Sequence, residues 1–152
     1  MTREEDDERR LALERAVRAL ARRDHSAASL RAKLERAGVS EPARDEAVET
    51  LAGVGYLDDE RFARDRAERL AARGYGDDWI RGDLDVQGVS PEVAETALAG
   101  LEAERERALR EAAKLGAGPR MARALQRRGF SEETLEGVVT ESVADDPWGG
   151  VG

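Results

Sequence analysis

Residues 20–51 read LARRDHSAASLRAKLERAGVSEPARDEAVETL, and residues 70–101 read LAARGYGDDWIRGDLDVQGVSPEVAETALAGL, so the two stretches align at a constant offset of 50 without a gap. Ten of the 32 positions are identical. The identities fall where a helix buries an apolar side chain or ends, as the Gly38/Gly88 pair illustrates. Such self-similarity marks a repeated structural unit, so this stretch predicts tandem helical modules.

A third copy follows the second at a further offset of 41. In it, Met121, Leu125, Gly129 and Ser131 take the places of Ile80, Leu84, Gly88 and Ser90. The glycine is predicted to end a helix, because it enters the left-handed conformation there without strain. The serine two residues later is predicted to cap the next helix. The corner between two helices therefore occurs three times.

Each module is predicted to contain three short helices. The first helix of the first module carries an apolar stripe at Leu13, Ala16, Val17 and Leu20. The second helices are expected to begin at Ser26, near Gly76 or Asp77, and at Pro119. The resulting organisation is a disordered acidic leader (1–9), three repeats (10–55, 56–102 and 103–144) and a flexible tail (145–152) that holds Trp148.

The two joints between modules differ. Residues 53–57, Gly-Val-Gly-Tyr-Leu, should break the helix, whereas residues 101–109 contain no breaker and are expected to run on as one long helix. A module of about 45 residues buries too little surface to be stable alone, so its neighbours must stack against it. The predicted fold class is all-α, an elongated array of three tandem three-helix repeats.

Composition supports helices and excludes several classes of protein. Charged residues make up 38% of the chain and aromatic residues 4%, and Ile80 is the only isoleucine, which argues against a β-sheet protein. There is no cysteine, so a disulfide framework and a thiolate metal site are excluded. The acidic start is the opposite of a secretory leader, and no apolar run is long enough for a membrane span. We therefore expect a cytoplasmic protein.

The net charge of −8 argues against a protein that binds duplex DNA on its own. Of the 25 cationic residues, 23 are arginines, which favour bidentate contacts to carboxylates or phosphates.

Catalytic and cofactor motifs are not found. His25 is the only histidine and has no nearby partners for a catalytic triad. The cluster Asp58, Asp59 and Glu60 could suggest a metal site, but helix capping explains it, since adjacent helical residues point in different directions. No glycine-rich phosphate loop occurs. We expect no catalytic residue, no metal and no cofactor.

Arginines recur at helical spacing in all three modules. The stripes are Arg15, Arg18 and Arg22; Arg66, Arg69 and Arg73; and Arg120, Arg123 and Arg127. Together they could form an interrupted basic track, or each could be a solvated face paired with nearby glutamates. Tyr56, Tyr75 and Trp79 near a module joint could stack on bases or pack in an interface.

The stretch GYLDDERFA (residues 55–63), followed by RGYG (residues 73–76), resembles the signature of the RecX regulatory proteins. The flanking LARRDHS (residues 20–26) and RRGFS (residues 127–131) agree with it, and the resemblance spans residues 10–143. It implies three tandem three-helix repeats without a catalytic site. It also implies one partner, the RecA recombinase filament, in whose groove such proteins lodge. We expect this chain to be a monomer.

The resemblance implies an inhibitor of the ATPase, strand-exchange and co-protease activities of RecA, and hence a modulator of DNA recombination, DNA repair and the SOS response. The residues expected to contact the partner are Arg22, Arg23, Arg31, Arg64, Arg69, Arg73 and Arg81. The signature residues Gly55, Tyr56, Leu57, Asp58, Asp59, Arg61, Phe62, Gly74 and Tyr75 are expected to pack at the module joint.

The chain departs from the family pattern in its charge. Family members are often basic, and here Asp77 replaces the usual proline, Asp83 the usual glutamate and Gln87 the usual basic residue. Direct contact with DNA is therefore expected to be weak or indirect. The alternative function is a helical-repeat nucleic-acid-binding protein that acts without a recombinase, which predicts strongly salt-sensitive binding to DNA.

Overall fold

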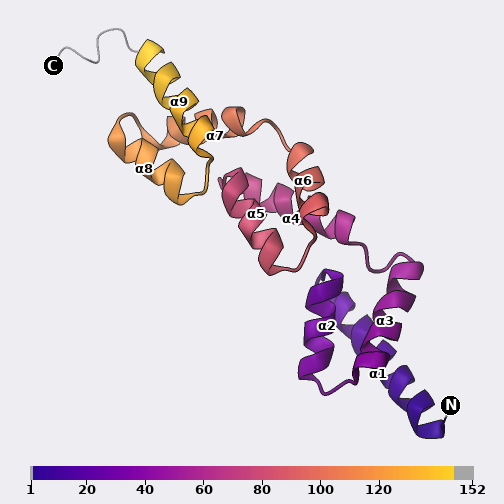
Figure 1. Cartoon of the computed structure of the whole chain (residues 1–152). Coiled ribbons are helices and arrows are strands. Elements are labelled where there is room, and N and C mark those ends of the chain that lie inside the picture. Colours follow the sequence, from indigo (N-terminus) through magenta and orange to yellow (C-terminus); the bar gives the residue numbers. More distant parts are fainter. Residues whose placement is uncertain (1, 146–152) are drawn as a thin grey trace. The chain divides into compact units, whose positions relative to one another are not determined.

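A computed structural model describes residues 2–145, and within that range every regular element is an α-helix (Figure 1). The first repeat contains α1 (Arg3–Arg22), α2 (Ala27–Arg36) and α3 (Glu41–Gly53). The second contains α4 (Asp59–Ala72), α5 (Asp77–Val86) and α6 (Pro91–Ala99), and the third contains α7 (Glu104–Leu115), α8 (Pro119–Arg127) and α9 (Glu132–Asp145). The predicted all-α repeat fold is confirmed.

The repeated corner has the predicted backbone. Gly38, Gly88 and Gly129 have φ values of +83°, +77° and +80°, the left-handed conformation that ends a helix without strain only at glycine. Two residues later, the Ser90 hydroxyl accepts a hydrogen bond from the Val93 amide at 3.3 Å, and Ser131 does the same for Thr134. Ser40 occupies the same position, but its side chain makes no capping hydrogen bond to the first turn of its helix.

Contacts divide the chain into two compact units that do not follow the repeat boundaries. One unit contains residues 1–63 and 84–94, and the other contains residues 64–83 and 95–152. The three helices of the middle repeat therefore contribute residues to both units.

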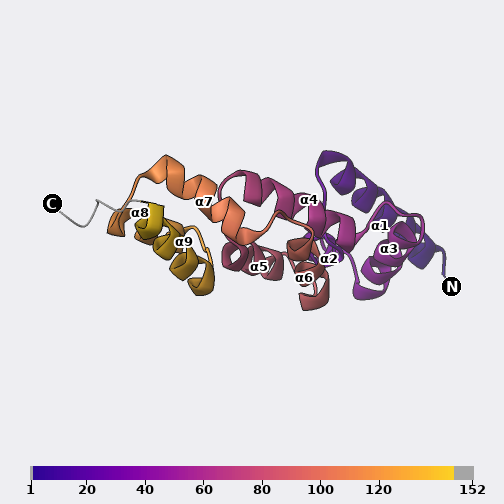
Figure 2. The same cartoon turned by 90° about the horizontal axis from the view of Figure 1, so that it is seen from above.

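The core of the first unit is rich in alanine. Helices α1, α2 and α3 pack against one another in pairs (Figure 2). The buried residues are Ala12, Ala16, Ala19, Leu30, Leu34, Ala43, Ala47, Val48, Leu51 and Leu57. Val17, which the sequence placed on the core stripe, is 45% exposed, so that prediction is wrong. The buried face of α1 is formed by Ala12, Ala16 and Ala19.

Residues 84–94 complete the first unit by contacting the start of α2. The Ser26 hydroxyl donates a hydrogen bond to the Gln87 carbonyl, and it also accepts one from the Ser29 amide. A side chain at Gly88 would collide with the methyl group of Ala28. The corner glycine of the second repeat therefore ends its own helix and makes room for the first repeat.

In the second unit, α7, α8 and α9 pack around Ala108, Ala112, Met121, Leu125, Phe130 and Val138. Residues 74–79 lie against the corner of this repeat. The Gly76 amide donates to the Arg128 carbonyl at 2.8 Å, and the Asp78 amide donates to the Gly129 carbonyl at 2.9 Å. A side chain at Gly76 would overlap the backbone of Phe130. Only glycine allows this approach between the two backbones.

The acidic leader is helical, so its expected disorder is wrong. Helix α1 begins at Arg3, and Thr2 and Glu5 form a reciprocal capping box. Three acidic residues in the first turn interact favourably with the helix dipole. Glu8 also accepts a hydrogen bond from the Ser40 amide at 3.3 Å, which ties this segment to α3.

The expected continuous helix over residues 101–109 is also wrong. Helix α6 ends at Ala99 and α7 begins at Glu104. Gly100 lowers helix propensity at this point. The carbonyl of Glu102, left without a helical partner, accepts a hydrogen bond from Arg107 Nε at 3.0 Å. Residues 146–152 lie outside the described residues, and with them the prediction of a flexible tail holding Trp148.

Candidate functional site

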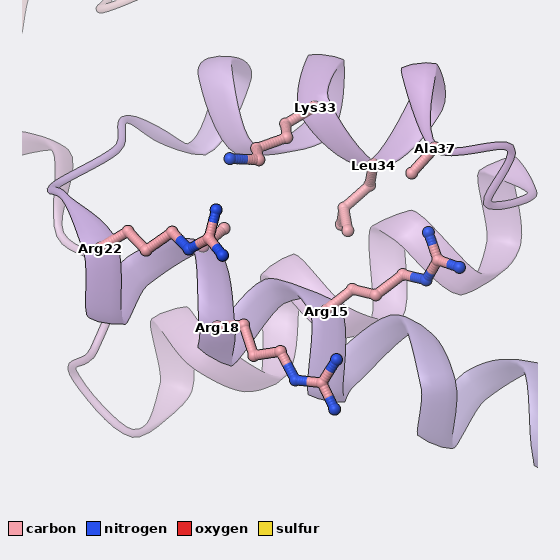
Figure 3. Close-up of a pocket in the computed structure, with 7 residues that line it drawn as sticks. Arg15, Arg18, Arg22, Lys33, Leu34 and Ala37 are labelled. Atoms are coloured by element: carbon pink, nitrogen blue, oxygen red, sulfur yellow. The ribbon is translucent and has the colours of Figure 1, made fainter.

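A hollow of about 190 Å³ lies between α1 and α2 and is lined mainly by cations (Figure 3). Arg15, Arg18 and Arg22 come from α1, and Lys33 comes from α2. The apolar part of the lining is formed by Ala19, Leu34 and Ala37. We call these four cations and three apolar residues the first-repeat pocket.

Helical spacing explains how the pocket forms. Residues 15, 18 and 22 share one face of α1 beside the buried alanine stripe, because positions three and four apart lie next to each other on a helix. Lys33 precedes Leu34, whose side chain is buried against the other helices. The core contact that brings the two helices together thereby places Lys33 opposite the arginine face.

The charges of the pocket are not balanced within the described structure. Arg15, Arg18, Arg22 and Lys33 make no salt bridge or side-chain hydrogen bond with another described residue. Other cations of this repeat do: Arg9 lies 2.7 Å from Glu46, and Arg31 lies 3.3 Å from Asp45. The pocket is thus a local concentration of positive charge in a chain of net charge −8.

Two of the four cations turn toward the space between the helices. Figure 3 shows the Arg22 guanidinium and the Lys33 ammonium group pointing into it from opposite sides. Arg15 extends toward the Ala37 end of the pocket, and Arg18 points away from α2. Arg22 and Lys33 therefore form the centre of the pocket, and the other two arginines lie at its edge.

His25 lies in the short connection between α1 and α2 and is 3% exposed. Its Nδ1 is 3.0 Å from the Ser29 hydroxyl, while Nε2 is buried without a partner among the described residues. Burial lowers the pKa of His25, and the positive charges of Arg23, Lys33 and Arg36 lower it further against the opposing effect of Asp24. The neutral ring thus lies in the positive field of this repeat.

The seven arginines that are expected to contact the partner fall into two groups. Arg31 pairs with Asp45, Arg64 lies 3.8 Å from Asp65, and Arg81 contacts Asp78 at 2.8 Å and Glu95 at 2.5 Å. In contrast, Arg22, Arg23, Arg69 and Arg73 are exposed and have no charged partner in the described structure. These four are available for contacts with another molecule.

The stripe on α4 is not a uniform basic face. Arg66 makes a two-pronged salt bridge with Asp83, and both side chains are half-buried, whereas Arg69 and Arg73 are exposed. Hydrogen bonding to Asp83 raises the pKa of Arg66. Arg120, Arg123 and Arg127 of the third repeat are all exposed.

The signature stretch forms structural contacts at the joint. Asp58 caps its own helix by accepting a hydrogen bond from the Arg61 amide at 3.1 Å. Asp59 instead accepts from the Ala27 amide at 2.8 Å, at the start of α2. The Arg61 guanidinium donates to the carbonyls of Gly55 and Tyr56 and closes the turn.

The signature residues that are expected to pack at the joint differ in burial. Leu57 and Phe62 are buried, but Tyr56 is 68% exposed, so its predicted packing is wrong. Its backbone carbonyl, rather than its ring, is held in the turn. Tyr75 stacks on Trp79 with ring centres 4.6 Å apart, and Trp79 remains 45% exposed.

Two features of the site region were not predicted from the sequence. Lys33 was not part of any arginine stripe, although its place beside an apolar core position could have indicated it. The second feature is a polar network in the second unit. There Arg107 contacts Asp77, and Glu104 accepts hydrogen bonds from Ser131, Thr134 and the Asp77 amide.

Among residues 2–145, no cluster of three His, Asp or Glu side chains is arranged to hold a metal ion. Over the same residues, none of the helices is both long and apolar enough to span a membrane.

Comparison with known proteins identifies the repeats. The family model for "RecX, first three-helix domain" matches residues 12–51, and that for "RecX, second three-helix domain" matches residues 58–98. A "Regulatory protein RecX" from Halorhodospira halophila is 34% identical over 148 residues, covering 90% of this chain and 91% of the relative. One from Xanthomonas campestris pv. campestris (strain B100) is 38% identical over 92 residues, 60% of this chain and only 57% of that relative.

Solved structures show the same fold. The crystal structure of RecX from Lactobacillus salivarius superposes with a TM-score of 0.81 at 19% identity, covering 90% of this chain and 97% of that one. A second crystal structure, of a regulatory protein RecX, gives a TM-score of 0.75 at 20% identity over 88% of this chain and 72% of that one.

Proposed function

This chain belongs to the RecX family, and from that membership we propose that it regulates a RecA recombinase filament by binding to it, without catalysing a reaction of its own. The observation that carries the proposal is the similarity to the Halorhodospira protein, which extends over nearly the full length of both chains. The proposed effect is inhibition of the ATPase, strand-exchange and co-protease activities of the recombinase. The protein would thereby modulate DNA recombination, DNA repair and the SOS response.

The proposed mechanism is multivalent binding. Repeated modules can contact several protomers of a filament at once, and linked weak contacts give a higher overall affinity than any single one. Binding changes the activity of the filament only if the protein prefers one of its conformational states.

The proposed contacts are the arginines Arg22, Arg23, Arg31, Arg64, Arg69, Arg73 and Arg81. The largest contributions to binding are expected from Arg22, Arg23, Arg69 and Arg73. These four are exposed and form no ion pair with another residue in the range 2–145, so they can bind a carboxylate or phosphate of the partner without first losing such a pair. Arg31 and Arg81 must exchange their present partners, Asp45 and Glu95, for new ones. They are expected to contribute less.

The test is DNA-dependent ATP hydrolysis by the cognate recombinase, titrated with this protein well below one copy per protomer. Inhibition at such ratios, at which too little protein is present to cover the DNA, would support filament regulation. Unchanged hydrolysis together with tight, salt-sensitive binding to DNA alone would overturn the proposal and favour the alternative, a nucleic-acid-binding protein that needs no recombinase.

Charge reversal on α4 tests the contacts themselves. The double substitution Arg69→Glu and Arg73→Glu is expected to raise the concentration needed for half-inhibition by at least about tenfold. Both side chains are exposed, so the helical circular dichroism spectrum should not change. A control with Arg3→Glu and Arg10→Glu makes the same charge change near the start of α1. Inhibition unaffected by the α4 substitutions would remove Arg69 and Arg73 from the interface.

A further inference from the structure

The first-repeat pocket has an excess of positive charge that none of the described residues neutralises. Four cations line it, and none of them forms an ion pair with a described residue. Salt bridges elsewhere in the repeat show that carboxylates are available, as the Arg9–Glu46 and Arg31–Asp45 pairs demonstrate. Arg22 and Lys33 turn toward the same space without a counter-ion and therefore repel each other, and a bound anion relieves that repulsion.

The donor groups suit a phosphate better than a single carboxylate. Arginine offers a planar fork of N–H donors that matches two oxygens of a phosphate, and lysine adds a compact positive charge. Arg15 and Arg22 are seven positions apart, or about 10 Å along the helix axis, and Arg18 lies between them. One carboxylate would neutralise only one of four cations, whereas neighbouring phosphate groups can contact several of them.

The size and walls of the pocket fit an oxyanion of this kind. A volume of about 190 Å³ is the space of about six water molecules, enough for a phosphate group with part of its hydration shell. Ala19, Leu34 and Ala37 provide an apolar wall. Beside such a wall, electrostatic attraction is screened less than in bulk water.

We propose that the first-repeat pocket is a binding site for clustered phosphate oxyanions, with Arg22 and Lys33 as its central ligands and Arg15 and Arg18 as flanking ones. The phosphates come either from the backbone of a single-stranded nucleic acid or from a free polyphosphate. The site belongs to the isolated chain, so it does not depend on the proposed regulation of a recombinase.

His25 provides a built-in reporter for this site. It is the only histidine, so its ring gives one set of proton resonances. The charge of Lys33 is among the causes that lower its pKa. An anion bound at Lys33 cancels part of that charge, so occupancy of the pocket should raise the pKa of His25.

The experiment titrates the full-length chain with tripolyphosphate and, separately, with a short oligothymidylate, using NMR of His25 and calorimetry. Citrate serves as the carboxylate control. We expect both phosphate ligands to bind with one site and to raise the pKa of His25, and citrate to bind at least about tenfold more weakly. Tighter binding of the oligothymidylate would identify nucleic acid as the source, and tighter binding of tripolyphosphate would identify a free polyphosphate.

Matched variants locate the site. The double substitution R22Q/K33Q should weaken tripolyphosphate binding by at least about tenfold. The double substitution R10Q/R36Q removes the same charge from the same two helices, outside the pocket lining, and should leave binding within about twofold. The proposal is overturned if neither phosphate ligand binds, if citrate binds equally well, or if both variants weaken binding to the same extent. Recombinase inhibition is assayed separately, so failure of either proposal is recognised independently.

Discussion

Arg107 connects segments that are distant in the sequence of the second unit. Its side chain is buried, contacts Asp77, and donates hydrogen bonds to the carbonyls of Tyr75 at 3.1 Å and Glu102 at 3.0 Å. A buried guanidinium with all these partners satisfies backbone groups that no helix can satisfy at these positions. This one residue therefore connects the turn at Tyr75 with the turn at Glu102.

Replacement of Arg107 by methionine is expected to destabilise the protein by about 3 kcal/mol, because it leaves Asp77 and two carbonyls without a partner. Urea denaturation measures the change. Arg110→Met is the control one turn later on the same helix, where the salt bridge with Glu102 is exposed. Equal effects of the two substitutions would show that burial of Arg107 contributes nothing to stability.

Glu104 gives the second unit a specific pH dependence. Burial alone would raise its pKa, but hydrogen bonds from Ser131, Thr134 and the backbone amides of Asp77 and Ser131 outweigh burial, so the pKa is lowered from 4.5. A carboxyl group with a lowered pKa in the folded state stabilises the protein above its unfolded pKa. That stabilisation is lost as the pH falls through the folded value.

Glu104→Gln should therefore lower stability at neutral pH and flatten the loss of stability below pH 4.5. Burial raises the pKa of Asp77 and opposes this effect in the wild type, so the two proteins must be compared across the same pH series. The measurement is the urea midpoint as a function of pH. Glu106→Gln, on the exposed side of the same helix, is the control. If the urea midpoint of the Glu104 variant falls as steeply below pH 4.5 as that of the wild type, Glu104 is not the source of this pH dependence.

Two glycines near α5 show how position decides the effect of the same substitution. Gly76→Ala should destabilise the protein by about 2 kcal/mol or more, because its methyl group would overlap the Phe130 backbone. Gly82→Ala should stabilise it by about 0.5–1 kcal/mol, because Gly82 lies inside α5 beside open space. Thermal unfolding measures both. A stabilising effect at both positions would mean that residues 74–79 do not lie against the third repeat as described.

Most elements could be predicted from the sequence because local signals set their ends. The corner at Gly38, its two repeats and the start of α8 at Pro119 depend on backbone preferences of single residues, and these were predicted. The start of α1 was missed because a run of acidic residues suggested disorder. In the structure a capping box formed by Thr2 and Glu5 begins the helix there. The break after Ala99 was missed although Gly100 lies there, because the contact of Arg107 with Tyr75, 32 residues away, is not visible in the sequence.

The candidate site was predictable only in part. Helical spacing placed Arg22 on a basic face, but spacing cannot show which arginines find carboxylate partners on another helix. Arg66 pairs with Asp83, 17 residues away, and Arg81 with Glu95, 14 residues away. The addition of Lys33 to the arginines of α1 likewise depends on the packing of two helices. Pairing across helices is a tertiary property that a linear pattern does not contain.

At the scale of the whole molecule, the compact units make a prediction about fragments. Fragment 1–63 lacks residues 84–94, which belong to the same unit, and fragment 1–83 lacks them as well. Fragment 1–94 contains them and should therefore unfold at a higher urea concentration than the other two. The reason is the contact of Gln87 and Gly88 with the start of α2. Equal midpoints for fragments 1–83 and 1–94 would contradict this division of the chain.

The interleaving of the two units also constrains how this protein can exchange parts with its relatives. A single crossover between two homologous genes divides the chain at one point. A crossover at any point inside residues 64–94 leaves both units with segments from two parents. If a whole repeat is exchanged, the two residues of a contact between repeats come from different parents. This applies to the hydrogen bond from Ser26 to the Gln87 carbonyl and to the contact of Gly88 with Ala28. Selection at these positions should therefore act on two neighbouring repeats together rather than on a single repeat.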